Sequence, residues 1–317
     1  MNTYLDFEKP IAELEGKIRE LEHAAGGDSV NVGEEVAKLK AKADQLVRAT
    51  YAKLNAWQKT QVARHPDRPH FDDFVAGLVE DFTPLAGDRL FGDDKAIVGG
   101  LGRFRGRSVM VIGHEKGRGT DGRVAHSFGM ARPEGYRKAI RLMHMADRFR
   151  LPVITLVDTP GAFPGADAEA RGIAEAIARG IEACLDLRVP LIACIVGEGG
   201  SGGAVAIAAA NRVLMLEHAV YTVATPEACA SILWHAAEKA PEASEALKIT
   251  AKDLLKLKVI DAIVPEPIGG AHRAPAETIA ALGDAIEENL KGFAGIDPGT
   301  VREARRRKFL DMGRTGL

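Results

Sequence analysis

The stretch VPLIACIVGEGGSGGAVAIAAA, residues 189–210, is the part of the sequence that decides the fold. Its first eight residues, Val189–Val196, form a nearly continuous apolar run of strand length, which is typical of a strand covered on both faces. Residues 202–210 are small and apolar, as in a short buried helix. Between these two runs, five of the seven residues 197–203 are glycine. We therefore predict a buried strand, a glycine-rich loop and a short helix in succession.

The segments on both sides of this stretch repeat the alternation of strand and helix. The predicted strands are Lys95–Phe104, Arg107–Gly113, Leu151–Val157, Arg212–Leu216 and Val259–Val264. The predicted helices are Pro133–Arg148, 168–187, 226–235, 242–247 and 250–258. Because apolar strands alternate with helices, we predict an α/β core with both faces of the sheet covered.

The two ends of the chain have a different pattern. Residues 8–64 read as an antiparallel helical hairpin with a break at Gly26-Gly27, and the two prolines of His65–Pro69 end it. Near the other end, 274–292 reads as a surface helix and the basic tail Arg302–Lys308 as a solvated helix. We divide the chain into a docking or structural hairpin, 1–65, a core, 66–268, and a C-terminal helical extension, 269–317.

Composition narrows the classes of function. The formal net charge is −2, so the overall charge does not favour nucleic acid or an anionic membrane as a partner. The three cysteines, Cys184, Cys194 and Cys229, form no zinc-finger pattern and fit free thiols in a reducing cytosol. No signal peptide is visible and the apolar runs are too short to span a bilayer, so we expect a cytoplasmic protein.

Two segments that follow buried strands are the best candidates for a ligand site. They are DTPGAFPG, Asp158–Gly165, and GEGGSGGA, Gly197–Ala204. Ligands of α/β sheets usually bind at the carboxyl ends of the strands. The Asp-x-x-Gly of the first segment also occurs in nucleotide-hydrolysing switch proteins, but the required GxxxxGK[ST] loop is absent upstream.

The second segment fits two motifs that use side chains. Gly197-x-Gly199-x-x-Gly202 matches a dinucleotide fingerprint with Glu217 downstream, although the following helix is short for such a unit. Gly199-x-Ser201-x-Gly203 matches the nucleophile elbow of a serine hydrolase. The downstream residues available for a catalytic triad are Asp253, Asp261 and His272, and nothing in their setting marks them for one.

A third interpretation needs no side chain. A Gly-Gly pair that opens a helix presents unpaired backbone N–H groups beside the positive end of the helix dipole. Such donors form an oxyanion hole, and glycine lets the substrate approach closely. If the glycines served only tight packing of strand on helix, a cluster of five would be an unusually large cost in backbone entropy.

At these residues the sequence resembles the alpha-subunit family of bacterial acetyl-CoA carboxylase carboxyltransferases. The resemblance covers nearly the whole chain. Besides DTPGAFPG and GEGGSGGA, it includes LDFEKPIAELE (Leu5–Glu15), DDKAIVGG (Asp93–Gly100), PEGYRKA (Pro133–Ala139), CASILW (Cys229–Trp234) and PEPIGGAHR (Pro265–Arg273).

The resemblance implies a crotonase-like (ClpP/crotonase) spiral of ββα units with an N-terminal helical hairpin and C-terminal helices. It implies transfer of a carboxyl group from carboxybiotin, held on biotin carboxyl carrier protein, to acetyl-CoA. The product is malonyl-CoA, in the first committed step of fatty acid biosynthesis. It also implies a zinc-ribbon beta subunit in an alpha2beta2 heterotetramer, no metal on this chain, and ATP used only by a partner biotin carboxylase.

The site residues follow from the same resemblance. Gly202 and Gly203 match the oxyanion-hole glycines of the family. The expected substrate-binding residues are Gly161, Ala162, Phe163, Gly199, Gly200, Ser201, Lys116 and Arg118. Lys116, Arg118 and Arg123 lie in or beside the loop Gly117–Phe128, which is less basic than expected for the family. We expect Glu198 to be structural, and His272 to be structural or part of an interface.

Three other functions remain open from the sequence. One is a stand-alone crotonase-superfamily acyl-CoA hydratase or isomerase. The second is a serine hydrolase that uses Ser201. The third is a non-enzymatic scaffold whose N-terminal hairpin docks a partner.

Overall fold

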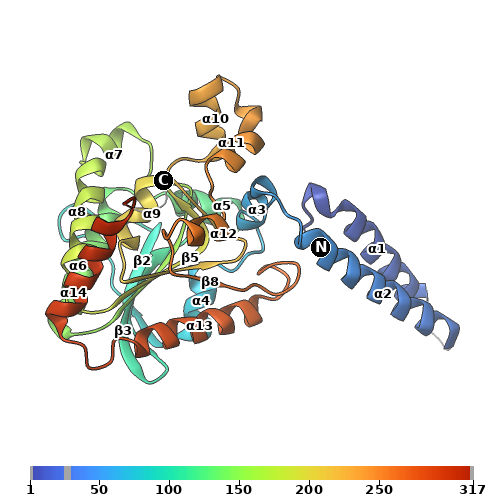
Figure 1. Cartoon of the computed structure of the whole chain (residues 1–317), viewed down its shortest axis with the longest axis horizontal. Helices are drawn as coiled ribbons and strands as arrows, with labels where there is room; N and C mark the ends of the chain where they lie inside the picture. The colour runs from blue at the N-terminus through green and yellow to red at the C-terminus, as the bar shows by residue number, and fades with distance from the viewer. Residues whose placement is uncertain (1–2, 25–29, 315–317) are drawn as a thin grey trace.

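The computed structural model describes residues 3–24 and 30–314, so the predicted turn at Gly26-Gly27 lies outside the described residues. The N-terminal part contains a short 3₁₀ turn η1 (Asp6–Glu8) and the helices α1 (Lys9–Ala24), α2 (Val30–Tyr51) and α3 (Ala56–Ala63). In Figure 1, α1 and α2 lie side by side and project away from the rest of the chain.

A small apolar cluster holds this helical pair at its base. It consists of the buried side chains of Ile11, Val47, Tyr51 and Val62. The Tyr51 hydroxyl also donates to Glu8 Oε1 at 2.9 Å, which satisfies two buried polar groups at once. The division of the chain at residues 65 and 268 remains a prediction.

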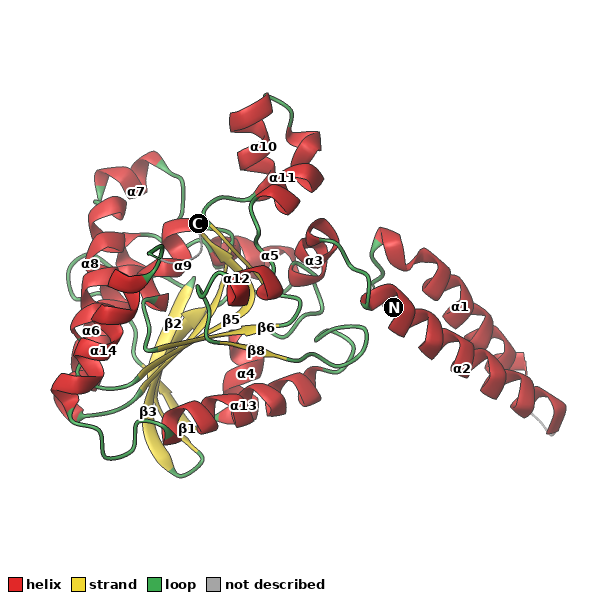
Figure 2. Ribbon diagram, in the orientation of Figure 1, coloured by secondary structure: helices red, strands yellow, loops and turns green. Residues whose placement is uncertain are grey.

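An eight-stranded mixed sheet forms the centre of the molecule (Figure 2). The strands run in the order β1-β2-β3-β4-β5-β6-β8, and β7 pairs with the end of β5. Pairing is antiparallel between β1, β2 and β3 and parallel from β3 onward. Their bounds are β1 Glu80–Pro84, β2 Ile97–Phe104, β3 Arg107–His114, β4 Val153–Thr159, β5 Leu191–Gly200, β6 Arg212–Leu216, β7 Val220–Thr222 and β8 Ala262–Val264.

Helices cover both faces of this sheet. On one face, α6 (Pro133–Phe149) and α9 (Ser201–Ala208) pack on the strands, and α8 (Ile173–Asp186) packs against both. On the other face, α13 (Pro275–Lys291) packs on β5, β6 and β8. The remaining helical elements are α4 (Phe71–Leu78), α5 (Gly119–Ala125), η2 (Ser127–Gly129), α7 (Ala166–Ala170), α10 (Pro226–Trp234), η3 (Ala237–Lys239), α11 (Ala240–Ala246), α12 (Ala251–Lys256) and α14 (Pro298–Asp311).

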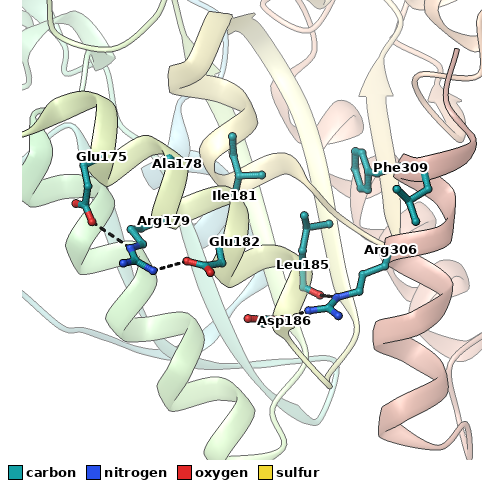
Figure 3. A pocket seen from close by; sticks show the side chains of 10 residues that line it. Glu175, Ala178, Arg179, Ile181, Glu182, Leu185, Asp186, Arg306 and Phe309 are labelled. Atoms are coloured by element: carbon teal, nitrogen blue, oxygen red, sulfur yellow. Dashed lines mark hydrogen bonds and ion pairs between the residues drawn. The ribbon is translucent and has the colours of Figure 1, made fainter.

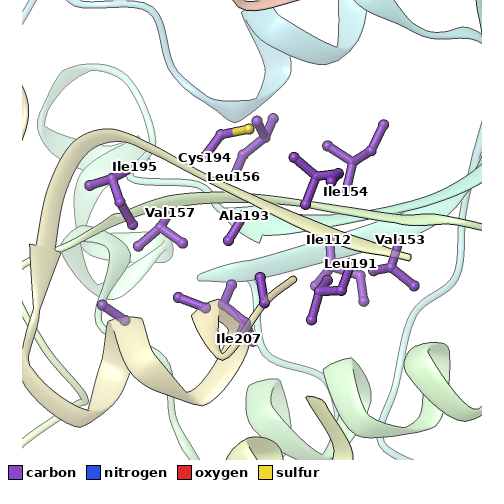
Figure 4. Close-up of a cluster of buried hydrophobic side chains, with 14 of the residues drawn as sticks. Ile112, Val153, Ile154, Leu156, Val157, Leu191, Ala193, Cys194, Ile195 and Ile207 are labelled. Atoms are coloured by element: carbon purple, nitrogen blue, oxygen red, sulfur yellow. The ribbon is translucent and has the colours of Figure 1, made fainter. Parts of the chain in front are cut away.

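The two central strands are buried along their whole length. Every residue of β4 and of β5 is buried, because helices cover the sheet above and below them. Figure 4 shows Val157, Ile195 and Ile207 in this cluster, where the strands meet α9. The segments that follow β4 and β5 are therefore attached directly to the buried core, which fixes their positions.

The glycine run differs from the prediction in one respect. We predicted a loop from Gly197 onward, but β5 continues through Gly200 and α9 begins at the next residue. The short strand β7 pairs with Glu198, Gly199 and Gly200, and Gly199 also pairs with Thr159 of β4. Because neighbours on both sides accept and donate backbone hydrogen bonds, the run remains extended.

Two further predictions needed correction. The helix expected over 168–187 is divided into α7 and α8 at Gly172, whose φ of +79° is left-handed. The basic tail is helical, but it is not fully solvated, because Arg305 is completely buried. Arg305 donates to the carbonyl oxygens of Cys184, Leu187 and Val189, where α8 ends. Among the described residues, no helix is long and apolar enough to cross a membrane.

Candidate active site

The ends of β4 and β5 approach each other so closely that glycine is required. A Cβ on Gly200 would lie 2.1 Å from the carbonyl oxygen of Pro160. A Cβ on Gly203 would lie 2.6 Å from the carbonyl carbon of Gly161 and 2.8 Å from the nitrogen of Ala162. The two segments that the sequence singled out therefore form one structural unit, joined backbone to backbone.

The first turn of α9 offers free backbone donors. Gly200 is the N-cap and has no side chain to cap the helix. The N–H groups of Ser201, Gly202 and Gly203 have no acceptor within the helix, since they belong to its first turn. Among the described residues, no turn, loop or cap accepts a hydrogen bond from the N–H of Gly202 or Gly203, whereas Ser201 directly follows the pairing of Gly200 with Thr222 of β7. The positive end of the α9 dipole adds to their attraction for an oxyanion, so the turn can stabilise negative charge on an approaching oxygen.

Gly202 is the more accessible of the two predicted oxyanion-hole residues. Gly203 is buried against Gly161, whereas Gly202 is half-buried. Gly202 lines a cavity of about 390 Å³ together with Ser201, Val205, Tyr221, Thr222, Val223, Leu247, Leu254 and Val259. A ligand in this cavity would meet the first turn of α9 at Ser201 and Gly202.

Tight contacts also fix the segment after β4. The hydroxyl of Thr159 donates to the carbonyl of Gly161 at 2.7 Å, which closes a turn around Pro160. Phe163 is anchored by its own N–H, which donates to the carbonyl of Ala131 at 3.0 Å. The guanidinium of Arg132 lies 3.8 Å from the centre of the Phe163 ring, a cation–π contact. Arg132 thus covers one face of the Phe163 ring, which leaves the other face for a ligand.

A buried network of ion pairs lies beside the glycine unit. The ammonium of Lys116 is 2.7 Å from Asp158 Oδ1 and 3.2 Å from Glu198 Oε2. Arg64 Nε is 2.6 Å from the other oxygen of Glu198. The N–H of Glu198 donates to Asp158 Oδ1 at 2.8 Å. Lys116 therefore ties the end of β4 to the end of β5.

The network keeps its charges despite its burial. Burial alone would raise the pKa of Glu198, but the charges of Lys116 and Arg64 outweigh it and hold that pKa below its usual value. Burial would lower the pKa of Lys116, and the charges of Asp158 and Glu198 raise it above its usual value instead. Glu198 and Lys116 therefore stay ionised at neutral pH.

The structure separates the two basic residues predicted to bind substrate. Lys116 lines a small cavity of about 160 Å³ whose wall also includes Arg64, Arg68, Arg123, Asp158 and Glu198. Arg118 is 60% exposed and pairs with Asp73 on the surface. Of the predicted substrate-binding residues, Gly199 and Gly200 lie inside the sheet, where a Cβ on Gly199 would meet the ring of Tyr221 at 2.7 Å.

His114 lies between the glycine unit and the ion network. It is 1% exposed, and neither ring nitrogen has a hydrogen-bond partner. Burial, with a smaller contribution from the charge of Lys116, lowers its pKa to about 3, and the backbone of Gly203 acts in the opposite direction. His114 is therefore neutral at physiological pH and packs between the two regions.

One feature matches the serine hydrolase interpretation, because Ser201 has a left-handed φ of +52° between β5 and α9, but the partner residues of a triad are not at hand. At the start of α12 the Asp253 carboxylate accepts from the Thr250 hydroxyl, and the Asp253 N–H donates back to that hydroxyl. Asp261 accepts from Val213 N–H and pairs with Lys308. The ring of His272 stacks on His65 at 3.8 Å. The Asp and His side chains are committed elsewhere, and the Ser201 side chain is exposed. No triad forms.

One cluster in the described residues has the composition of a metal site. Glu8, His65 and His272 offer ligand atoms within 4.8 Å of one another. However, His65 already uses both ring nitrogens, one toward the carbonyl of Thr3 at 3.0 Å and the other as acceptor from Asp67 N–H at 3.1 Å. The guanidinium of Arg273 also lies 3.5 Å from Glu8. The cluster joins the N-terminal helices to the core, which suits a structural role for His272.

A larger cavity, of about 770 Å³, lies on the surface between α8 and α14 (Figure 3). Ile181, Leu185 and Phe309 line it, and the charged side chains at its rim pair with one another, as Arg179 does with Glu175 and Glu182. It shares no lining residue with the cavity at the first turn of α9, and its charged groups are paired with one another. We therefore place the candidate active site at the glycine unit.

Sequence reasoning missed several contributors to this site. Arg64 comes from the linker after α3, and Tyr221, Leu247 and Leu254 come from the segments after β6. No motif marks these residues. For Arg64, the only local signal is its position just before the proline-rich linker.

Known proteins resemble this chain in sequence along nearly its whole length. The sequence model of the family described as "Acetyl co-enzyme A carboxylase carboxyltransferase-like" matches residues 4–313. A relative from Paramagnetospirillum magneticum, named acetyl-coenzyme A carboxylase carboxyl transferase subunit alpha, is 64% identical over 313 residues, which cover 99% of each chain.

Solved structures show the same fold at low identity. The transcarboxylase 12S structure matches with a TM-score of 0.57 and 22% identity, covering 70% of this chain and 41% of that chain. The beta subunit of P. aeruginosa geranyl-CoA carboxylase matches with a TM-score of 0.54 and 18% identity, covering 80% of this chain and 46% of that chain. This chain spans less than half the length of either. Both neighbours share its α/β architecture, a crotonase-like fold.

Proposed function

The chain belongs to the acetyl-CoA carboxylase carboxyltransferase family, as an alpha subunit and a transferase, and from this premise we propose how its site works. The N–H groups at the start of α9 hold the oxygen on which negative charge develops during carboxyl transfer. The observation that supports this proposal is the half-buried Gly202, whose N–H has no partner and which lines a cavity of about 390 Å³.

Carboxyl transfer to a thioester builds negative charge on carbonyl oxygens. Donors that are already aligned stabilise such charge without reorganisation, and one donor is typically worth about 10²–10³ in rate. In this site Gly202 donates toward the cavity, while Gly203 packs on Gly161 and keeps the turn in register. Gly161 and Ala162, which were also expected to bind substrate, lie against Gly203 rather than among the residues that line this cavity.

Biotin fits the residues that are present. The cavity combines apolar walls, from Val205, Tyr221 and Leu254, with backbone donors at one end. Biotin is an uncharged ring system with one polar carbonyl, so its apolar part suits the walls and its carbonyl suits the donors. When it is carboxylated on biotin carboxyl carrier protein, the group supplies the carboxyl that is transferred. Ser201, at the mouth of the cavity, would contact it through the backbone.

Lys116 has a positioning role in this proposal. Its ammonium is engaged by two carboxylates, so it has little charge to offer a substrate. By holding Asp158 and Glu198 together, it sets the distance between the segments that carry Gly161 and Gly203. Arg118, exposed on the surface, remains the better candidate for contact with a phosphate of coenzyme A.

A partner is needed to complete the site. The alpha subunit works with a beta subunit, which we propose carries the zinc ribbon and binds most of acetyl-CoA, in an alpha2beta2 assembly. ATP is used elsewhere, by a biotin carboxylase. We place the complex in the cytoplasm, because Cys184, Cys194 and Cys229 are all free thiols.

The test is malonyl-CoA-dependent carboxylation of biocytin by this chain alone, by the beta subunit alone and by the mixture. We expect activity only in the mixture. Activity of this chain alone would overturn the shared site. An inactive mixture that hydrates an enoyl-CoA without biotin would favour the stand-alone crotonase alternative.

A further inference from the structure

A small helical projection interrupts the fold between β7 and α12. It consists of α10, η3 and α11, residues 226–246. Figure 1 shows α10 and α11 standing away from the sheet, above α9 and α12. Two contacts secure its base: Glu245 accepts from the N–H of Ala56 at 2.8 Å, and Glu227 pairs with Arg64 at 2.5 Å. The projection is therefore held in a defined position.

The tip of this projection exposes large apolar side chains. Ile232 is 73% exposed, Leu233 60% and Trp234 40%. They are consecutive, so they point around the last turn of α10 rather than along one face, and all five residues from Ser231 to His235 are exposed. Single exposed apolar residues are ordinary, but a whole apolar turn that includes a tryptophan marks a contact surface.

The projection is continuous with the candidate active site. Val223 lies three residues before its first residue and Leu247 immediately follows its last, and both line the cavity that contains Ser201 and Gly202. Val223 is 75% exposed, and Ser201 is exposed as well. Small-molecule sites usually bury 70–90% of their ligand. A protein seated on the projection would also cover the open mouth of this cavity.

We propose that the apolar tip of α10, defined by Ile232, Leu233 and Trp234, docks the beta subunit and thereby closes the active-site cavity. The proposal rests on the proposed function, which requires a partner. Both fold neighbours have chains more than twice the length that this chain matches, which leaves room in each for a second region of comparable size. The partner should present an apolar recess for the tryptophan, with little charge at its centre.

The experiment measures the affinity of purified beta subunit for four forms of this chain by sedimentation velocity. The forms are wild type, Leu233→Asp, Trp234→Ala and, as a matched control, Phe149→Asp. Phe149 is 62% exposed at the end of α6, far along the chain from the projection. We expect Leu233→Asp and Trp234→Ala to weaken binding about 30-fold or more, as hot-spot residues do, and Phe149→Asp to leave it unchanged. Thermal unfolding of each isolated chain should match wild type, because all the altered side chains are exposed.

The outcomes separate this inference from the proposed function. Carboxyl transfer by the two tip variants should return to near the wild-type rate at saturating beta subunit, because no tip residue lines the cavity. Wild-type affinity in both variants would overturn the docking surface while leaving the function intact. Loss of self-association by this chain, with unchanged binding of the beta subunit, would overturn it in favour of a second copy. A wild-type complex that assembles but transfers no carboxyl group would instead refute the function.

Discussion

Two regions meet at the end of β5, and one acts through backbone groups whereas the other acts through charged side chains. The glycine unit, formed by the ends of β4 and β5 and the first turn of α9, works through backbone groups, and side chains are excluded by contacts such as that between Gly203 and Gly161. The ion network beside it works through the side chains of Lys116, Asp158, Glu198 and Arg64. One region presents donors to a ligand, and the other holds those donors in place. On the proposed account, a site that uses backbone donors still depends on charged side chains for its geometry.

The largest effect should come from Gly203→Val, which tests the glycine unit directly. Its Cβ would lie 2.6 Å from backbone that cannot move aside, so the first turn of α9 must shift. We expect carboxyl transfer by the assembled complex to fall on the order of 10³-fold. Gly202→Ala is the control, because its Cβ meets only the Ile177 side chain, at 3.2 Å. Equal activity of the two variants would contradict the claim that Gly203 is held against rigid backbone while Gly202 has room for a Cβ.

Lys116→Met tests the other region. It leaves Asp158 without a cation and Glu198 with only Arg64, and an uncompensated buried charge is costly. We expect the free energy of unfolding in urea to fall by about 3 kcal/mol. The matched control is Arg118→Gln, which breaks a surface pair and should cost less than about 1 kcal/mol. Similar losses for both variants would show that the network is not a special support.

The difference between these regions also explains what the sequence could reveal. The apolar runs and the glycine cluster are local, so the α/β core, most of its strands and the segments that carry Gly161, Gly202 and Gly203 were predictable. The end of β5 was placed too early, since β7, which keeps Gly197–Gly200 extended, is only three residues long. No local sequence pattern predicts so short a strand.

The ion network could not be predicted for a different reason. Lys116 is 82 residues and Arg64 is 134 residues from Glu198 along the chain, and only the folded sheet brings them together. Burial of Arg305 escaped prediction in the same way, because its acceptors at the end of α8 lie 116–121 residues away. Charged residues in a basic stretch look solvated until the carbonyls that they bind are located.

His114, which lies between the two regions, should give the stability a pH dependence. Its pKa is about 3 in the folded chain and near 6.5 when unfolded, so the unfolded state binds the proton first. Its contribution to stability is present above pH 6.5 and is lost as the pH falls toward 3. Between pH 6.5 and pH 5 the loss should be about 2 kcal/mol.

Urea unfolding of wild type and His114→Gln at these two pH values measures that contribution. The variant cannot titrate at this position, so its loss of stability on acidification should be smaller than that of wild type by about 2 kcal/mol. An identical loss in both proteins would mean that His114 is protonated in the folded state, in conflict with its burial.

The smallest expected effect is that of Ser201→Ala. The side chain is exposed and the backbone is unchanged by the substitution, so activity should stay within about twofold of wild type. Labelling by a fluorophosphonate probe should also be absent in wild type. Labelling at Ser201, or an inactive alanine variant, would revive the hydrolase alternative.

The central claim is that a backbone N–H at the start of α9, rather than a side chain, stabilises the charge formed in carboxyl transfer. The most direct test compares Gly202→Pro with Gly202→Ala in the assembled complex. Both add a Cβ at one position, but only proline removes the N–H, and proline is tolerated in the first turn of a helix. With unfolding temperature and assembly unchanged, we predict a rate about 10²–10³-fold lower for proline than for alanine. Equal rates for the two variants would contradict the account.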